Sequence, residues 1–282
     1  MAAAAARQVR FDCITFLSDY GLSDEFVAVC KGVIRGIAPR VEILDISHSI
    51  EPFDLRHAAG VLARSVAYMP AAVHLAIVDP TVGSARRSVI VLSRDGSVFV
   101  GPDNGLLTGA LAARGGPEEA WEIANPALIS AEVSGTFHGR DIFAPAAAHA
   151  AMGYPLDEFG PPVSVETLER PAEPRVLDHG DHLHCEVLGV DRFGNAQLSV
   201  RAEVLSEVLG VQPGEPLDVL IGSQGYQLRW FDHFSAAGVG DRLVVTDSSG
   251  HAALAVNLGS FAGAAGIEAG DRVVLGRPER QS

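Results

Sequence analysis

The stretch Val73-His-Leu-Ala-Ile-Val-Asp-Pro-Thr-Val-Gly83 decides the fold class of the N-terminal half, because it joins a nearly unbroken apolar run to a polar turn. An apolar run without alternation is typical of a strand covered on both faces, as in a parallel sheet. Similar runs at Cys13–Leu17 and Val41–Ile46 precede it, and amphipathic segments at residues 23–37 and 54–68 separate the three. This βαβαβ series predicts an α/β N-terminal domain with a largely parallel sheet.

Helix caps and a hairpin extend this prediction. Ser23 and Asp54 stand at the starts of the two amphipathic segments and are residue types that cap helices well. Two β-branched runs, Ser88–Leu92 and Ser97–Val100, predict a hairpin at the edge of the sheet. We expect two further helices to complete the domain, near residues 106–113 and 141–152.

A proline-rich stretch separates the two halves of the chain. Residues 160–174 contain four prolines, which remove backbone donors and disfavour a continuous helix or a central strand. We interpret residues 161–176 as a linker between an α/β domain at 10–160 and a second domain at 177–282. Short strand candidates at turn-punctuated intervals predict a mostly-β, barrel-like C-terminal domain. These candidates are His182–Val190, Ala196–Val200, Leu217–Ile221, Tyr226–Trp230, Arg242–Thr246 and Ala252–Asn257.

Composition and charge exclude several classes of function. The 282 residues are 48% hydrophobic and 20% charged, which suits globular domains whose folding depends on burial. The chain carries 35 acidic and 21 basic residues, a formal charge of −14. Because phosphate recognition needs a basic face, we expect neither nucleic acid nor an anionic membrane as a partner. A small cationic ligand meets no such barrier.

The cysteines and the N-terminus point to a reducing compartment. Cys13, Cys30 and Cys185 are widely spaced and odd in number, which fits neither a disulfide framework nor a zinc module. Residues 1–7 lack a cationic region ahead of an apolar stretch, and no later segment approaches about 18 uninterrupted apolar residues. We therefore expect a cytoplasmic protein.

Polar side chains stand at the ends of all three predicted parallel strands, at Ser18–Gly21, Asp45–His48 and Asp79–Gly83. No glycine-rich dinucleotide fingerprint follows the first strand, and no phosphate-binding loop motif occurs, so ordinary dehydrogenases and nucleoside triphosphatases lose support. Asp19 follows the first strand and Asp79 follows the third. Ligand crevices of open α/β sheets lie at the carboxyl ends of strands, so both are candidate site residues. The alternative is that each aspartate only caps a turn.

The segment Gly135-Thr-Phe-His-Gly-Arg-Asp-Ile-Phe-Ala-Pro145 brings three polar groups to a helix entrance. Asp141 can cap this helix, with Pro145 still in its first turn. His138 lies between glycines just before the helix, a position suited to a side chain that points into a cleft. Arg140 and Asp141 can equally form a structural ion pair, and a single histidine is more often structural.

Six motifs occur in order along both predicted domains: Ser18-Asp-Tyr-Gly21, Asp79-Pro-Thr-Val-Gly-Ser-Ala-Arg86, Gly101-Pro-Asp-Asn-Gly-Leu-Leu107, Phe137-His-Gly-Arg-Asp-Ile-Phe-Ala-Pro145, Asp191-Arg-Phe-Gly-Asn195 and Asp247-Ser-Ser-Gly250. Together they resemble the S-adenosylmethionine hydroxide adenosyltransferases, which are relatives of the fluorinases and chlorinases. The resemblance extends from about Ile14 to Val274.

The resemblance implies a hydrolase that converts S-adenosylmethionine and water to adenosine and L-methionine. Water-using members carry an Asp-Arg-His triad that matches Asp79, Arg86 and His138, whereas halide-using members have tyrosines at the Asp79 and His138 positions. Arg86 and the substrate sulfonium would favour hydroxide, and either His138 or Asp79 could take the proton from water. No metal or redox cofactor is implied.

The resemblance also implies the residues that bind the substrate. Asp19 matches the carboxylate that holds the ribose hydroxyls, and Phe53 matches an aromatic beside the ribose, although Phe53 fits a plain core position equally well. The remaining matches lie in the C-terminal domain: Asp191 for the methionine amine, Phe193, Asn195 and Phe234 for adenine, and Ser248 and Ser249 for the amino-acid group of methionine.

Family members assemble as trimers whose sites combine two subunits, so the resemblance implies a homotrimer. Two other functions remain open. A non-catalytic S-adenosylmethionine or adenosine binding module would need Asp19, Asp191 and Asn195 but not the triad. A halide transferase would need a dehydrated anion pocket, in which the Asp79 carboxylate would repel the halide.

One cluster raises the alternative of a metal site. His179, His182, His184 and Cys185 are close in sequence and are types that bind zinc. The run directly follows the proline-rich stretch, and His182 and His184 would share one face of an exposed strand. We therefore interpret these residues as surface histidines and expect no metal.

Overall fold

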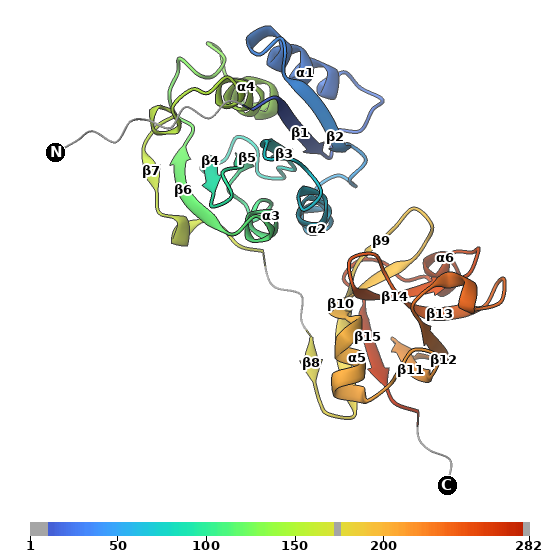
Figure 1. Ribbon diagram of the computed structural model, residues 1–282. Coiled ribbons are helices and arrows are strands. Elements are labelled where there is room, and N and C mark those ends of the chain that lie inside the picture. Colours follow the sequence, from blue (N-terminus) through green and yellow to red (C-terminus); the bar gives the residue numbers. More distant parts are fainter. Residues whose placement is uncertain (1–10, 172–175, 279–282) are drawn as a thin grey trace. The chain divides into compact units, whose positions relative to one another are not determined.

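The structure is a computed structural model that describes residues 11–171 and 176–278 (Figure 1). Contacts between Cα atoms divide the chain into two compact units, one ending at Pro171 and the other beginning at Ala172. In the described residues, no helix combines the length and the apolar character needed to cross a membrane.

Unit 1 is built around a seven-stranded sheet of order β2-β1-β3-β5-β4-β6-β7. The first four strands of this order run parallel, and the others pair antiparallel. The prediction of an α/β domain with a largely parallel sheet is therefore confirmed. Its elements are β1 (Cys13–Ser18), α1 (Phe26–Ile37), β2 (Glu42–Ser47), α2 (Leu55–Val66), β3 (Val73–Ile77), β4 (Ser88–Ser93), β5 (Val98–Pro102), α3 (Thr108–Ala113), β6 (Pro117–Glu122), η1 (Gly139–Phe143), α4 (Ala144–Ala151), η2 (Leu156–Glu158), β7 (Pro162–Val163) and η3 (Val165–Thr167).

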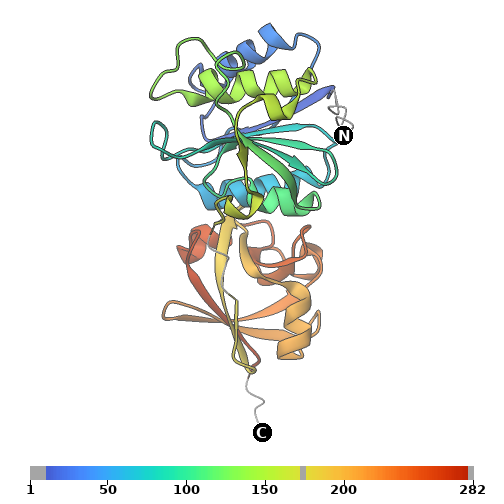
Figure 2. The same cartoon turned by 90° about the vertical axis from the view of Figure 1, so that its left-hand side faces the viewer.

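Helices cover both faces of this sheet, and Figure 2 shows one pair on each side. Phe16 and Leu75 pack into the core with α1 and α4, whereas Leu17 and Ala76 pack into a second core with α2 and α3. Successive residues of a strand point to opposite faces, so every residue of β1 and β3 is buried. This explains the unbroken apolar runs that the sequence shows.

Several element positions in unit 1 differ from the predictions. The β4–β5 hairpin lies inside the sheet, because β5 pairs with β3 and β4 pairs with β6, so its predicted edge position is wrong. The sequence analysis missed β6, whose consecutive glutamates interrupt its apolar pattern. Asp54 caps α2 by accepting a hydrogen bond from the His57 amide at 2.9 Å. Ser23 does not cap α1, which begins after Glu25 without a side-chain cap.

The first part of the expected linker is structured. Strand β7 pairs with β6, and η3 follows it. The Arg87 guanidinium donates to Thr167 Oγ1 at 3.0 Å, and the Glu169 amide donates to the Asp103 carboxylate at 2.9 Å. Residues 161–171 therefore belong to unit 1, and residues 172–175 of the expected linker lie outside the described residues.

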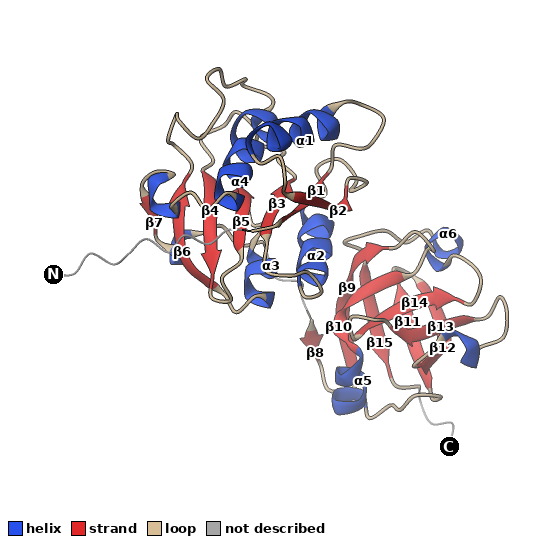
Figure 3. Cartoon of the chain, turned by 45° about the horizontal axis from the view of Figure 1, so that its top comes forward, coloured by secondary structure: helices blue, strands red, loops and turns tan. Residues whose placement is uncertain are grey.

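Unit 2 is a closed barrel of seven strands, ordered β10-β14-β13-β12-β11-β15-β9, with β9 pairing back onto β10 (Figure 3). The prediction of a mostly-β, barrel-like domain is confirmed. The two helices and β15 were not predicted. The elements are β8 (Leu177–Asp178), β9 (His182–Val190), β10 (Ala196–Arg201), α5 (Ala202–Leu209), β11 (Pro216–Ile221), β12 (Gln224–Phe231), η4 (Phe234–Ala236), β13 (Arg242–Thr246), β14 (His251–Val256), α6 (Phe261–Ala265) and β15 (Arg272–Gly276).

Candidate active site

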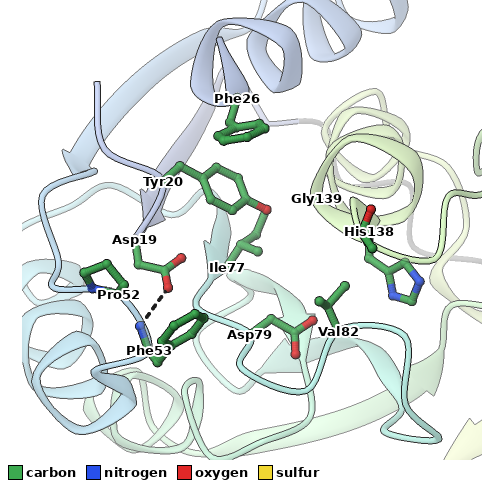
Figure 4. Close-up of a pocket in the computed structure, with 11 residues that line it drawn as sticks. Asp19, Tyr20, Phe26, Pro52, Phe53, Ile77, Asp79, Val82, His138 and Gly139 are labelled. Carbon is green, nitrogen blue, oxygen red and sulfur yellow. Dashed lines mark hydrogen bonds between the residues drawn. The ribbon is translucent and has the colours of Figure 1, made fainter. Parts of the chain in front are cut away.

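A pocket of about 240 Å³ lies in unit 1 beyond the carboxyl ends of β1 and β3. Asp19 follows β1 and Asp79 closely follows β3, and both aspartates line the pocket at this edge of the sheet. Figure 4 shows these two carboxylates and the His138 ring around the same pocket. The remaining lining residues are Tyr20, Phe26, Pro52, Phe53, Ile77, Val82, Thr136 and Gly139.

Arg86 joins Asp79 to His138 at one side of this pocket. Its Nε lies 3.1 Å from Oδ1 and 3.0 Å from Oδ2 of Asp79, and its Nη2 also donates to Oδ2. The same Nη2 lies 2.8 Å from Nδ1 of His138, although 52 residues separate the two in sequence. The side chains of Arg86 and Asp79 are only 7% exposed, so solvent screens this pair little.

This contact determines the protonation state of His138. A guanidinium has donors and no acceptor, so Nδ1 of His138 must accept the hydrogen bond and the imidazole proton must reside on Nε2. Burial and the neighbouring Arg86 cation both lower the pKa of His138 below its usual value. The imidazole is therefore neutral at pH 7 and carries its proton on the nitrogen that does not face Arg86.

Two glycines allow the loops that carry these groups to approach closely. A side chain at Gly83, which has φ +80°, would place its Cβ 2.5 Å from the carbonyl oxygen of Gly135. A Cβ at Gly139 would collide with the hydroxyl of Tyr20. The loop after β3 and the turn before α4 thus meet at Gly83, and the turn before α4 rests on Tyr20 at Gly139.

The Asp19 side of the pocket has an unusual backbone. The Phe53 amide donates to Asp19 Oδ2 at 3.0 Å, and Phe53 adopts φ 69°, a left-handed conformation that is uncommon for a bulky residue. The Phe53 side chain is 68% exposed, which excludes a core role. The structure therefore places Phe53 at the pocket and uses its backbone to hold Asp19.

A buried polar network lies behind Asp19 and is formed by polar residues at strand ends to which the sequence alone assigned no role. Ser18 Oγ lies 2.8 Å from Nδ1 of His48, both side chains are buried, and Nε2 of His48 lies 3.1 Å from Asp45 Oδ1. Lys31 completes the network through Asp45. Ser18 ends β1, and Asp45 and His48 lie at the end of the adjacent parallel strand β2, so these groups meet at one edge of the sheet.

Arg140 and Asp141 form the structural ion pair that the sequence left open. Nε of Arg140 lies 2.7 Å from Oδ1 of Asp141, and the Ser134 amide donates to Oδ2 at 2.8 Å. Although burial opposes its charge, the hydrogen bond from Arg140 holds the pKa of Asp141 below its usual value. Asp141 lies inside η1 and anchors the preceding loop, so its predicted role as a helix cap is wrong.

In unit 2, Asp191, Phe193 and Asn195 lie on the loop between β9 and β10. Asp191 Oδ1 accepts from the amides of Phe193 and Asn195, each at 2.9 Å, and Asn195 Nδ2 donates to Oδ2 at 2.8 Å. The Asp191 carboxylate thus shapes the loop, while the Phe193 ring is 76% exposed.

The other predicted contacts of unit 2 lie on two further loops. Ser248 and Ser249 follow Asp247, which accepts a hydrogen bond from the Ser249 amide at 2.8 Å. Gln197 of β10 also donates to the Asp247 carboxylate. Phe234 begins η4 and is 41% exposed. Within unit 2, none of these groups is part of the barrel core.

Comparisons with known proteins find relatives over both units. Models of the N-terminal and C-terminal domains of the SAM hydroxide adenosyltransferases match residues 14–160 and 185–274. A Salinispora tropica protein named "(R)-S-adenosyl-L-methionine hydrolase" is 45% identical over 92% of this chain and 96% of its own length. A protein from an Actinoplanes species named "Fluorinase" is 31% identical over 93% of this chain and 96% of its own length.

A solved structure shares both units. The crystal structure of an uncharacterized conserved protein from Thermotoga maritima matches with a TM-score of 0.87 and 35% identity, and the match covers 94% of this chain and 100% of that chain. Arg86 bonded to both Asp79 and His138, and two matched domains in the expected order, lead to one conclusion: the chain belongs to the S-adenosylmethionine hydroxide adenosyltransferase family.

Proposed function

We propose that the protein hydrolyses S-adenosylmethionine to adenosine and L-methionine. The observation that carries this proposal is the partly buried, hydrogen-bonded Asp79-Arg86-His138 triad at the edge of the pocket. The name of the Salinispora tropica relative, an S-adenosylmethionine hydrolase, supports the same reaction. An acidic protein also suits a cationic sulfonium substrate.

In the proposed reaction, the oxygen of water forms a bond to C5′ of the substrate. The C5′–S bond breaks, and its electron pair returns to sulfur to give the neutral thioether of methionine. The sulfonium is already an activated leaving group, so the protein has to position water in line and accept the proton that the water loses. The water finally loses one proton to give the 5′-hydroxyl of adenosine.

The tautomer of His138 supports a division of roles within the triad. Nε2 carries the proton, so His138 donates a hydrogen bond that orients the water oxygen and has no free lone pair there. Arg86, which is bonded to both Asp79 and His138, holds these two groups in place around that oxygen. We therefore assign to Asp79 the role of accepting the proton that the water loses. A carboxylate is basic enough for this, because the new C–O bond has made the attacking water strongly acidic.

The substrate contacts inferred from the family belong to the same proposal. Asp19 would accept hydrogen bonds from the ribose hydroxyls, and Phe53 would lie beside the ribose. In unit 2 the exposed Phe193 ring offers a surface on which adenine can stack. The remaining proposed contacts are Asn195 and Phe234 for adenine and Asp191, Ser248 and Ser249 for the methionine part.

We propose that the protein acts as a homotrimer in which each substrate is bound by unit 1 of one copy and unit 2 of the next. The division of the inferred contacts between the two units supports this assembly. We also propose a reducing, cytoplasmic location, which the three free and buried cysteines support. The reaction as written needs no metal or redox cofactor.

The deciding experiment incubates the protein with S-adenosylmethionine in water enriched in heavy oxygen, with and without chloride or fluoride. We expect adenosine labelled at its 5′-oxygen, in the same yield with and without halide. A halogenated nucleoside would indicate a halide transferase. Binding without turnover would indicate a non-catalytic binding module, and unlabelled adenosine would contradict attack by water.

A further inference from the structure

Three histidines converge on the surface of unit 2, at the hairpin formed by β8 and β9. The potential ligand atoms of His179, His182 and His184 all lie within 4.8 Å of one another. The ring centroids of His179 lie 4.8 Å from those of both His182 and His184. The residues assigned to the proposed hydrolysis do not include these histidines.

The hairpin explains why the three rings meet. The His179 amide donates to the carbonyl of His182 at 3.0 Å, and Gly180 has φ +85°, so a tight turn folds His179 back toward His182. His184 is two residues further along β9 and lies on the same face as His182. The shared face of His182 and His184 was predicted from the sequence. The turn that adds His179 was not, because it depends on the pairing of β8 with β9.

Cys185 does not belong to this cluster. It is buried, and its Sγ donates to the carbonyl of Val273 at 3.4 Å, on the opposite face of β9 from the histidines. A ligand at this hairpin would therefore meet three imidazoles and no thiolate.

Asp181 supports one of the imidazoles. Its Oδ1 lies 2.6 Å from Nδ1 of His182, which places the Nδ1 proton toward the carboxylate and leaves Nε2 of His182 with its lone pair. Histidines that bind metals commonly donate their other ring N–H to a carboxylate, which fixes the tautomer and makes the ligand more basic. This hydrogen bond is a second observation, independent of the convergence, that points to a metal.

We propose that His179, His182 and His184 form a binding site for a borderline divalent cation of the Zn²⁺ class. Imidazole ligands favour Zn²⁺, Ni²⁺, Co²⁺ and Cu²⁺ over Mg²⁺ and Ca²⁺. Zn–N bonds of about 2.0–2.1 Å require the ligand atoms to lie within about 4.2 Å of one another, so the rings close in by rotating about their side-chain bonds. These rings lie at the surface, where such a rotation meets little packing.

Such an ion would connect β8 to β9. Strand β8 has only two residues, and it pairs with β9 at Leu177 and Asp178. His179 follows this short strand directly, so an ion shared with His182 and His184 would hold the hairpin closed. The site would thus add stability to unit 2 that grows with the logarithm of the free metal concentration once this exceeds the dissociation constant.

The test uses the full chain without an affinity tag, stripped with a chelator and titrated with Zn²⁺ by calorimetry at pH 7.5. Co²⁺ is titrated in parallel, because its visible absorption reports nitrogen ligands, and Mg²⁺ serves as the ion that should not bind. The variants are His182→Ala, which removes one ligand, and Asp181→Asn, which removes only the supporting carboxylate. The matched control is His233→Ala, which removes another histidine of unit 2, on a different loop.

We expect one Zn²⁺ per chain and a visible Co²⁺ spectrum. His182→Ala should weaken Zn²⁺ binding about 100-fold or more, Asp181→Asn about 10- to 100-fold, and His233→Ala not measurably. His179→Gln and His184→Gln replace His182→Ala if that variant fails to fold. Absence of Zn²⁺ binding, or equal affinity in the ligand variants and the control, would overturn the proposal. Either result leaves the hydrolysis proposal untouched, since that reaction is assayed without added metal.

Discussion

Nη2 of Arg86 lies 2.8 Å from Nδ1 of His138. This distance requires a neutral imidazole, because a protonated Nδ1 would point its hydrogen at a guanidinium that can only donate. Arg86 is held in turn by Asp79 and by Ser88 Oγ, to which Nη1 donates at 2.7 Å. The guanidinium therefore has a fixed orientation before any substrate arrives, and several testable consequences depend on it.

The first prediction concerns the triad. Asp79→Ala, Arg86→Ala and His138→Ala should each lower turnover about 100-fold or more, because each removes a group that positions or stabilises the attacking water. Affinity for S-adenosylmethionine should stay within about tenfold of the unmodified protein, as measured by calorimetry beside single-turnover rates. Arg87→Lys is the matched control, since Arg87 binds Asp103 at 2.8 Å and takes no part in the triad. Full activity in all three alanine variants would refute the assignment.

The second prediction is an acidic limb in the pH profile of the reaction. Protonation of His138 would break its hydrogen bond from Arg86, and burial together with the Arg86 cation lowers its pKa below 6.5. Turnover should therefore be constant near pH 7 and fall as the pH drops below the usual histidine range. In His138→Asn, whose side-chain oxygen can still accept from Arg86, the residual rate should lose this limb. An unchanged limb in that variant would assign it to another group.

The third prediction tests the network behind Asp19. Ser18→Ala removes a buried hydroxyl that lies 2.8 Å from His48, and Thr15→Val removes a buried hydroxyl that lies 2.8 Å from His74. Both changes should destabilise the protein by about 1–3 kcal/mol, because each leaves Nδ1 of a buried imidazole without its hydrogen-bond partner. Only Ser18→Ala should raise KM, since only Ser18 adjoins Asp19. Equal KM values for Ser18→Ala and Thr15→Val would show that the network behind Asp19 stabilises the fold without affecting substrate binding.

The fourth prediction links stability to pH through His74. Burial, together with the Arg114 cation, lowers the pKa of His74 from 6.5 to about 4. Between these values the unfolded chain binds more protons than the folded one, so the free energy of unfolding should decrease as the pH falls from 6.5 toward 4. The loss from this group is on the order of 3 kcal/mol. Urea denaturation of His74→Gln should show a shallower decrease with falling pH, and an identical slope would contradict the argument.

The fifth prediction concerns assembly. If each site combines unit 1 of one copy with unit 2 of the next, His138→Ala and Asn195→Ala impair different halves of that site. Mixed trimers from co-expression should then recover activity at interfaces built from two intact halves. Light scattering should give a trimeric mass. A monomeric mass, or mixed trimers no more active than the parents, would refute the shared site without touching the proposed chemistry.

The sequence predicts the framework of both units well where local pattern and burial agree. The strands His182–Val190 and Arg242–Thr246 match their predicted bounds, because turns flank apolar residues that are buried in the barrel. Asp19 and Asp79 were found as site candidates from their places after strands alone. That argument works because parallel strands end at the same edge of a sheet.

Features that depend on contacts between residues far apart in the sequence could not be predicted from local patterns. The place of the β4–β5 hairpin follows from pairing with β3 and β6, which no local pattern encodes. The His138 tautomer depends on a contact with Arg86 from another loop. Helix α5 was missed because it follows β10 directly, without a side-chain cap to mark its start.

The strand order of unit 1 has a consequence for how this family could diversify. The chain passes from β1 to β2 on one side of β1, whereas β3 lies on the other side of β1. The connections that leave the ends of β1 and β3 therefore run in opposite directions and leave a crevice between these two strands. The opening between Asp19 and Asp79 is thus created by connectivity and not by any single side chain. The side chains at these strand ends can therefore be exchanged without changing the core that supports them. The Actinoplanes relative named "Fluorinase" aligns with 93% of this chain at 31% identity.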